Sequence, residues 1–148
     1  MSSYTQILYQ IVFSTKHRTK SLNRHNRDLL FKYISGILKK KDCHLYQIGG
    51  VSDHIHIVTH VHPSVALAYL VKDIKIASSK FIKSQDIFPL FTSWQEGYAA
   101  FTYSIQAKDN LIRYVQNQEE HHKETTFIDE LKELLKQHNV EYDEKYLV

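Results

Sequence analysis

The segment at residues 43–61, CHLYQIGGVSDHIHIVTHV, decides how this chain is expected to fold. Two runs of apolar and β-branched residues flank Gly49-Gly50, and this pattern predicts a β-hairpin with a tight turn at the glycines and a second strand at 54–61. Residues two apart in a strand point to the same side of the sheet. His54 and His56 therefore share one face, while the isoleucines that alternate with them point to the opposite face and into a core.

The hydrophobic pattern outside the hairpin predicts one helix and one strand on each side of it. The expected elements are a strand at 4–13, a helix from 23 or 26 to about 41, a helix from 63 or 64 to about 85, and a strand at 98–104. The resulting β-α-β-β-α-β order favours an α+β fold of the ferredoxin-like or RRM-like type, in which a four-stranded antiparallel sheet carries two helices on one face. Two C-terminal helices, about 108–121 and about 126–138, follow this core of about 4–104.

The composition indicates one globular domain over residues 1–148. The chain has 148 residues, of which 43% are hydrophobic, and a formal net charge of +3. A chain of this length and hydrophobicity can bury a core, which excludes intrinsic disorder. The single cysteine, Cys43, excludes an intramolecular disulfide and every multi-cysteine zinc motif. We expect Trp94 and Phe101 to lie in the core.

The sequence contains no recognisable targeting or membrane segment. Residues 1–6 lack the basic and apolar regions of a signal peptide. The longest apolar run, Val65 to Val71, is far shorter than the roughly 20 residues that span a bilayer. We therefore expect a soluble protein of the cytoplasm with no membrane partner.

The first chemical signal is the pair of histidines in Asp53-His54-Ile55-His56. Two imidazoles side by side on a strand can supply two nitrogen ligands to one divalent metal ion. The alternative is that they are ordinary surface histidines on a solvated sheet face. His60 and His62 continue the same alternation, and this weakens the pattern because four histidines cannot all bind one ion.

The second signal is Tyr114 with Gln118, which lie four residues apart in an expected helix. Residues at this spacing share a helix face, so the Tyr114 hydroxyl and the Gln118 amide can meet at one site. Such a pair occurs by chance in many helices, and alone it carries little information.

Taken together, these residues and three further markers resemble a known family. The markers are IVFSTKHR at 11–18, WQEGY at 94–98, and HHK at 121–123, directly after the Tyr114 helix. In order and spacing the chain resembles the single-tyrosine HUH transposases of the TnpA type, the IS200-like insertion-sequence transposases that act on single-stranded DNA. The resemblance covers nearly the whole chain. It implies an enzyme that cleaves and rejoins single-stranded DNA at insertion-sequence ends by transesterification through a 5′-phosphotyrosine.

The resemblance also implies the roles of the site residues. Tyr114 would be the nucleophile, and His54, His56 and Gln118 would bind a divalent metal ion, Mg²⁺, with Mn²⁺ also accepted. The choice of Mg²⁺ comes from the family, because imidazole ligands would accept Zn²⁺ at least as well. A covalent phosphotyrosine conserves the energy of the phosphodiester bond. No nucleotide cofactor is therefore expected, in keeping with the absence of a Gly-rich phosphate loop.

The partners that the family implies are DNA hairpins at the element ends and a second copy of the chain. In such a homodimer, the tyrosine helix of one subunit completes the site of the other in trans. The cell would be bacterial or archaeal, and the protein nucleoid-associated. Candidate DNA contacts are the basic residues Lys16, His17, Arg18 and Lys20 of one loop and Lys72 and Lys75 of a helix. For the two helix lysines, a solvated face is the competing interpretation.

Several alternatives stay open at this point. His121 and His122 could approach the metal or simply end the helix, where a positive charge is favourable. Asp53 could orient a histidine or shape the turn. The protein could also be a domesticated relative that binds hairpin DNA without transposition. A third alternative is an RNA-binding module, which would need exposed aromatic residues on its central strands.

Overall fold

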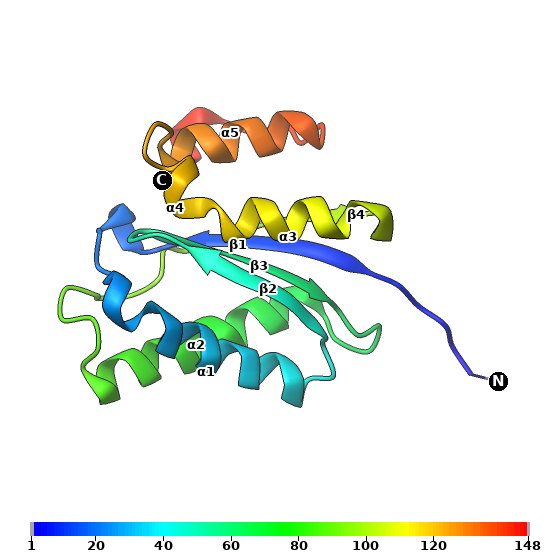
Figure 1. The fold of residues 1–148 in the computed structure, drawn as a ribbon, viewed down its shortest axis with the longest axis horizontal. Coiled ribbons are helices and arrows are strands. Elements are labelled where there is room, and N and C mark those ends of the chain that lie inside the picture. Colours follow the sequence, from blue (N-terminus) through cyan, green and yellow to red (C-terminus); the bar gives the residue numbers. More distant parts are fainter. Residues whose placement is uncertain (1, 148) are drawn as a thin grey trace.

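The computed structural model describes residues 2–147, and within this range the chain forms one four-stranded antiparallel sheet with helices on both faces (Figure 1). The strands are β1 (Leu8–Ser14), β2 (Leu45–Gly50), β3 (His54–His60) and β4 (Ala99–Tyr103), in the spatial order β2-β3-β1-β4. This order places the first and third strands at the centre of the sheet, as in ferredoxin-like folds. The predicted fold class is confirmed.

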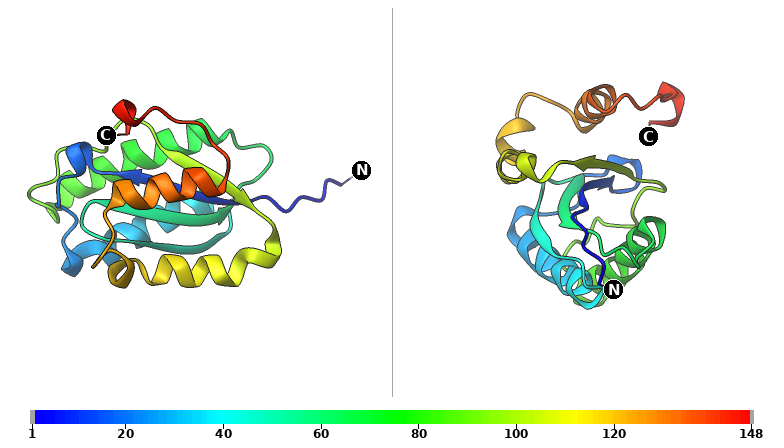
Figure 2. Two further views of the ribbon diagram at one scale, coloured as in Figure 1. Left: turned by 90° about the horizontal axis from the view of Figure 1, so that it is seen from above. Right: turned by 90° about the vertical axis from the view of Figure 1, so that its right-hand side faces the viewer.

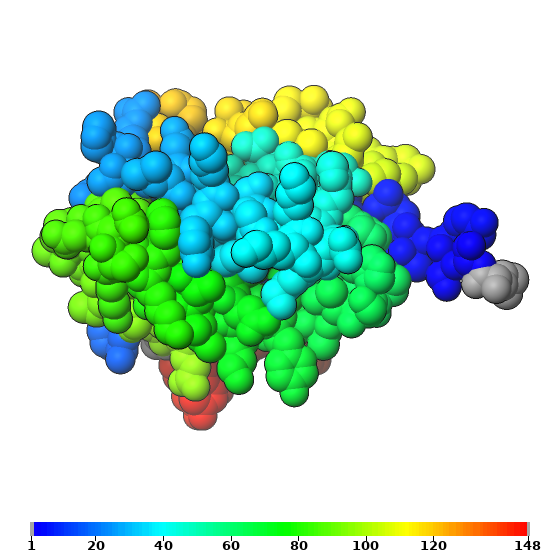
Figure 3. Space-filling model, turned by 90° about the horizontal axis from the view of Figure 1, so that it is seen from below, coloured from blue at the N-terminus to red at the C-terminus, as the bar shows by residue number. Residues whose placement is uncertain are grey.

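One face of the sheet is covered by α1 (Arg27–Lys40) and α2 (Leu67–Gln85), which form most of the surface seen in Figure 3. Each helix buries residues spaced by four or eight positions: Leu30, Ile34 and Leu38 in α1, and Leu70, Ile74 and Ile82 in α2. They share a core with Ile55 and Ile57, so the isoleucines that alternate with the histidines point as predicted. No helix within residues 2–147 is both long and apolar enough to cross a bilayer.

The opposite face is covered by α3 (Lys108–Gln116), α4 (Gln118–His121) and α5 (Phe127–Gln137), so the sheet lies between two helical layers (Figure 2). In one cluster, Leu111 and Val115 of α3 pack with Leu8 and Val58; in a second, Phe127 and Leu134 of α5 pack with Val12 and Phe101. An RNA-binding module of the RRM type exposes this face for base stacking. Here helices cover it, which removes the support for that alternative.

The hairpin turn lies later in the chain than the sequence predicts. Gly49 and Gly50 belong to β2, where they pair with His56 and Ile55, and the turn falls at residues 51–53. The expected tight turn at the glycines is therefore wrong. A Cβ atom at Gly49 would collide with the backbone carbonyl oxygen of Val115. The glycine is needed because α3 lies directly against β2.

The predicted helix at 108–121 is interrupted. The backbone leaves the helical region at Asn117 (φ −96°, ψ 20°), which separates α3 from α4.

The last helix agrees with the prediction and begins after Thr126, whose hydroxyl accepts a hydrogen bond from the Asp129 N–H at 3.2 Å. Trp94 and Phe101 are buried, as predicted. The first strand and α2 each begin later than expected, at Leu8 and Leu67.

Candidate active site

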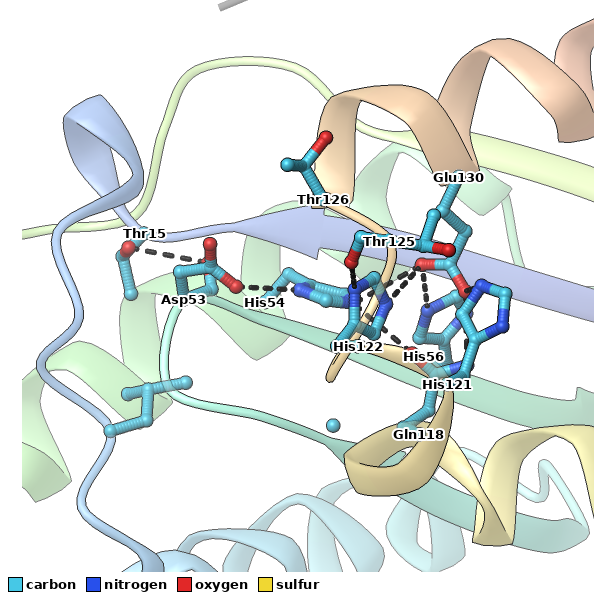
Figure 4. A network of polar contacts seen from close by, with 12 residues as sticks. Thr15, Asp53, His54, His56, Gln118, His121, His122, Thr125, Thr126 and Glu130 are labelled. Atoms are coloured by element: carbon cyan, nitrogen blue, oxygen red, sulfur yellow. Dashed lines mark hydrogen bonds and ion pairs between the residues drawn. The ribbon is translucent and has the colours of Figure 1, made fainter.

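Three histidine rings converge on one oxygen of the Glu130 carboxylate between the sheet and α5, and His121 brings its Nε2 atom to 3.4 Å from the other oxygen (Figure 4). His54 and His56 project from β3 and are fully buried. Their Nε2 atoms lie 3.2 Å and 3.0 Å from Oε1 of Glu130, which belongs to α5. His122, directly after α4, brings its Nε2 atom to 2.9 Å from the same oxygen. The side-by-side arrangement expected of the β3 histidines is thus present, and the rings are buried instead of solvated.

The second oxygen of Glu130 contacts the tyrosine helix. Oε2 accepts hydrogen bonds from the Tyr114 hydroxyl and from Nε2 of Gln118, the latter at 3.0 Å. The Gln118 Oε1 atom lies 3.1 Å from His54 Nε2. The structure therefore brings Tyr114, Gln118 and the two β3 histidines of one chain together around a single carboxylate.

The outer nitrogen of each ring is held by an oxygen atom. His54 Nδ1 lies 2.7 Å from Asp53 Oδ1, and His56 Nδ1 lies 2.7 Å from Gln10 Oε1. His122 Nδ1 lies 2.6 Å from the backbone carbonyl oxygen of Thr125. These contacts turn all three Nε2 atoms toward Glu130. Asp53 therefore contacts His54 in the way an orienting residue would.

The other two histidines of the alternating series lie outside the cluster. His60 Nδ1 accepts a hydrogen bond from the Ile7 N–H at 3.1 Å, and His62 Nδ1 accepts one from the Ser64 N–H at 3.1 Å. These nitrogens act as acceptors, the reverse of what the cluster histidines show. Their hydrogen bonds therefore separate His60 and His62 from the histidines of the cluster.

Burial and charge in the cluster shift the pKa values of its members. Burial alone would raise the pKa of Glu130, but the hydrogen bonds to His122, His54 and His56 outweigh it and hold the pKa far below its usual range. Burial would lower the pKa of His54, but its contacts with Asp53 and Glu130 raise it. The pKa of His56 is lowered by its complete burial. Glu130 is therefore an anionic carboxylate at neutral pH.

The pKa of Tyr114 is raised well above its usual value. Burial of the phenol is the largest cause, and the negative charge of Glu130 and the hydrogen bond to it add to the effect. The phenol therefore stays protonated at neutral pH in this arrangement. A nucleophilic role for Tyr114 requires positive charge near the hydroxyl.

Comparison with known proteins assigns the chain to a family. The sequence profile of the family described as transposase, IS200-like, matches residues 3–118. The chain belongs to the IS200-like transposases. The match covers the sheet, Tyr114 and Gln118, and it ends before His122 and Glu130.

Two solved structures share the fold of this IS200-like transposase. A candidate transposase from Deinococcus radiodurans superposes with a TM-score of 0.63 at 21% identity, covering 80% of this chain and 95% of that one. A REP-associated tyrosine transposase, solved bound to a REP hairpin, gives a TM-score of 0.57 at 13% identity, covering 79% of this chain and 72% of that one. No curated protein matches the chain. At these identities the two structures support the fold.

Four residues of the transposase could hold a metal ion. His54, His56, His122 and Glu130 each offer one ligand atom, and the four atoms lie within 4.8 Å of one another. Imidazole nitrogen and carboxylate oxygen are ligands that divalent metal ions accept. Gln118 Oε1, predicted as a ligand from the family, lies at the edge of the same group.

Sequence reasoning missed Glu130, although one signal was available. Glu130 lies three residues after Phe127 and four before Leu134, so it falls on the apolar stripe of α5. A lone acidic residue on such a stripe indicates a buried charge with partners. The sequence leaves His121 and His122 open between a helix-end role and a role near the metal. The Nε2 atom of His122 lies in the cluster, and that of His121 lies 3.4 Å from Glu130 Oε2.

The candidate DNA contacts fall in two places. The loop that carries Lys16, His17, Arg18 and Lys20 is largely exposed and lies beside the turn at Asp53, since the Thr15 N–H donates to the Asp53 carbonyl at 2.8 Å. Lys72 is exposed on α2. Lys75 is half-buried, and its Nζ atom donates to the carbonyl of Gln95 at 2.8 Å and to that of Gly97. The loop lies near the cluster, whereas the two α2 lysines belong to the other helical layer.

Proposed function

We propose that the protein cleaves and rejoins single-stranded DNA at insertion-sequence ends, with Tyr114 as the nucleophile. One observation carries the proposal. The Tyr114 hydroxyl, the Gln118 amide and the His54 and His56 rings meet at one carboxylate, although they come from segments about 60 residues apart. Membership in the IS200-like transposases supports DNA as the substrate. The finer mechanism follows from the chemistry of these side chains.

The proposed reaction exchanges one phosphodiester bond for another. The Tyr114 oxygen attacks the scissile phosphorus, and the bond from phosphorus to the 3′ oxygen breaks. The phenol loses its proton and the departing 3′ oxygen gains one, which leaves a 5′-phosphotyrosine and a free 3′-OH. Rejoining reverses these steps when a 3′-OH attacks the phosphotyrosine. Because the number of phosphodiester bonds is unchanged, no nucleotide cofactor is needed.

In this proposal His54, His56 and Gln118 hold a divalent metal ion, Mg²⁺ or Mn²⁺. Such an ion supplies positive charge that polarises the scissile phosphate and favours the phenolate. Asp53 and Gln10 fix the two β3 imidazoles in orientation through their Nδ1 atoms. The helical spacing of four residues keeps the Tyr114 hydroxyl and the Gln118 amide on the same side of the site.

The proposed partners are hairpin DNA and a second copy of the chain. The related REP-associated transposase was solved with a hairpin, and the exposed basic loop at 16–20 suits phosphate contacts. Each chain offers one nucleophile at this site, so joining two DNA ends calls for two chains. We place the protein with the cellular DNA in the cytoplasm.

The proposal is tested by incubating the protein with labelled single-stranded DNA from the flanks of its gene, with and without Mg²⁺ or Mn²⁺. We expect a metal-dependent covalent protein–DNA adduct on a denaturing gel, and its loss in Tyr114→Phe. The matched control is Tyr69→Phe, which changes an exposed tyrosine of α2 in the other helical layer. An adduct that survives in Tyr114→Phe would assign the nucleophile to another tyrosine.

The complete burial of His54 and His56 favours one alternative function. DNA cannot reach these rings while α5 covers them, which would suit a relative that binds hairpins without cleaving them. Tight hairpin binding with no adduct under any metal would establish this alternative.

A further inference from the structure

Two of the four clustered ligand residues lie beyond the segment that the family profile matches. The profile ends at residue 118, whereas His122 follows α4 and Glu130 lies on α5. Both pack against the β3 histidines, and only 8% of the His122 side chain and 2% of the Glu130 side chain are exposed. The C-terminal part of this chain therefore adds a third imidazole and a carboxylate to the pair on the sheet.

The hydrogen-bond partners place a hydrogen on the outer nitrogen of the rings. Asp53 Oδ1 and the Thr125 carbonyl can only accept, so the Nδ1 atoms of His54 and His122 carry hydrogen. Gln10 Oε1 faces Nδ1 of His56 in the same way. In a neutral ring with hydrogen at Nδ1, Nε2 presents a lone pair.

When the rings are neutral, three Nε2 lone pairs and a carboxylate oxygen share one buried space, and they need a cation among them. Without a metal, protons on Nε2 fill this need through the hydrogen bonds to Glu130, and a metal ion would take their place. Histidines that bind metals donate their other ring hydrogen to a carboxylate or a carbonyl, as these rings do. His60 and His62, outside the cluster, show the opposite pattern and accept at Nδ1.

The four ligand atoms lie within 4.8 Å of one another, and the distances from the Glu130 oxygen to the three nitrogens are close to those of four-coordinate binding. Around an ion with ligand distances near 2.0–2.1 Å, tetrahedral ligand atoms lie about 3.3 Å apart. Glu130 Oε1 lies 3.2, 3.0 and 2.9 Å from the three Nε2 atoms. Small outward shifts of the side chains would bring this oxygen to that spacing from all three nitrogens.

We propose that His122 and Glu130 complete, with His54 and His56, a four-ligand site for a transition-metal ion such as Zn²⁺, Co²⁺ or Mn²⁺. The inference deepens the proposed metal dependence and rests on it for the place of the ion. Three imidazoles favour these ions over Mg²⁺, which prefers oxygen ligands. Because Glu130 belongs to α5 and two ligands belong to β3, the bound ion fastens α5 to the sheet. With these four ligands in place, the ion would be closed to further ligands in its four-coordinate form, and release of Glu130 would open a position for a phosphate oxygen.

The test is a titration of the metal-free full-length protein with Co²⁺ alone, followed by visible absorption, and with Zn²⁺ alone, followed by calorimetry. We expect one ion per chain and the intense d–d bands of a four-coordinate Co²⁺ site. Glu130→Gln and His122→Gln should each weaken binding by more than about tenfold and alter the bands. The matched controls are Glu133→Gln, an exposed position on α5, and His62→Gln, which lies outside the cluster.

Circular dichroism checks that each variant is folded. If Glu130→Gln does not fold, metal binding by His122→Gln alone decides the test. Unchanged Co²⁺ binding in folded Glu130→Gln and His122→Gln, with binding lost in His56→Gln, would overturn the proposal and leave a site without the C-terminal ligands. Absence of Co²⁺ and Zn²⁺ binding by the wild type would also overturn it. The titrations contain no DNA, so the adduct assay with Tyr114→Phe judges the proposed function separately.

Discussion

At the scale of single residues, Glu130 contacts both the clustered imidazoles and the tyrosine helix. Its Oε1 atom faces the three imidazoles, and its Oε2 atom accepts hydrogen bonds from Tyr114 and Gln118. A carboxylate between positively charged or metal-bound imidazoles is stabilised, whereas the same charge opposes ionisation of the neighbouring phenol. The state of this one side chain therefore bears on both the nucleophile and the ligands.

The pH dependence of folding stability follows from the shifted pKa values in the metal-free protein. The pKa of Glu130 is lowered in the folded state. Its contribution to the free energy of unfolding is therefore present above about pH 4.3, the pKa of the unfolded state, and is lost as the pH falls. The pKa of His54 is raised, so its contribution is present below about pH 6.5 and is lost as the pH rises through the folded value. We expect the stability advantage of the wild type over Glu130→Gln to be greatest between these two pH values.

Urea unfolding with a chelator present, at a series of pH values from 3 to 9 for both proteins, measures this advantage. Glu133→Gln is the control and should follow the wild type, because Glu133 is exposed. An advantage that keeps growing below about pH 4 would contradict the lowered pKa of Glu130.

At the scale of elements, the close approach of α3 to β2 positions Tyr114. The approach depends on Gly49, where any Cβ would meet the Val115 carbonyl oxygen. We expect Gly49→Ala to destabilise the fold by about 1–3 kcal/mol, because α3 or β2 must shift. Gly36 lies in α1 with nothing within 4 Å of the position of its Cβ. Gly36→Ala should therefore stabilise the protein by about 0.5–1 kcal/mol, through helix propensity alone.

Thermal and urea unfolding of the two alanine variants check this pair. A loss of adduct formation larger in Gly49→Ala than in Gly36→Ala is expected as well, since a displaced α3 carries Tyr114 away from the cluster. Equal stabilities for the two variants would show that α3 is not held by this contact.

The same elements show what the sequence could and could not predict. Alternation in β3 was enough to place His54 and His56 on one face, because a strand has a strict period of two. The glycines were misplaced because a Gly-Gly pair serves a tight turn and a close helix contact equally well. The break at Asn117 has no glycine or proline to mark it. The partners of Glu130 depend on how α5 lies across the sheet, which local patterns do not encode.

At the scale of the whole molecule, the tyrosine helix lies on the sheet of its own chain. Leu111 and Val115 of α3 pack with Leu8 and Val58, and Tyr114 contacts the cluster of the same chain. The family resemblance implies the alternative, in which the helix of one subunit serves the site of another. Moving α3 to a second chain would expose this apolar cluster until the partner helix replaced it.

A mixing experiment distinguishes the two arrangements. Tyr114→Phe lacks the nucleophile, and His56→Gln lacks a ligand on β3, so each variant alone should form no adduct. If the site is built within one chain, as in this structure, a mixture of the two also forms none, because every His56 site keeps a phenylalanine beside it. If α3 serves the partner chain, mixed dimers unite Tyr114 with an intact β3 pair and the adduct returns. From the buried contacts of Leu111 and Val115 we expect no adduct in the mixture. The mixture is refolded together from urea so that subunits can exchange, and hairpin binding by both variants confirms that they are folded.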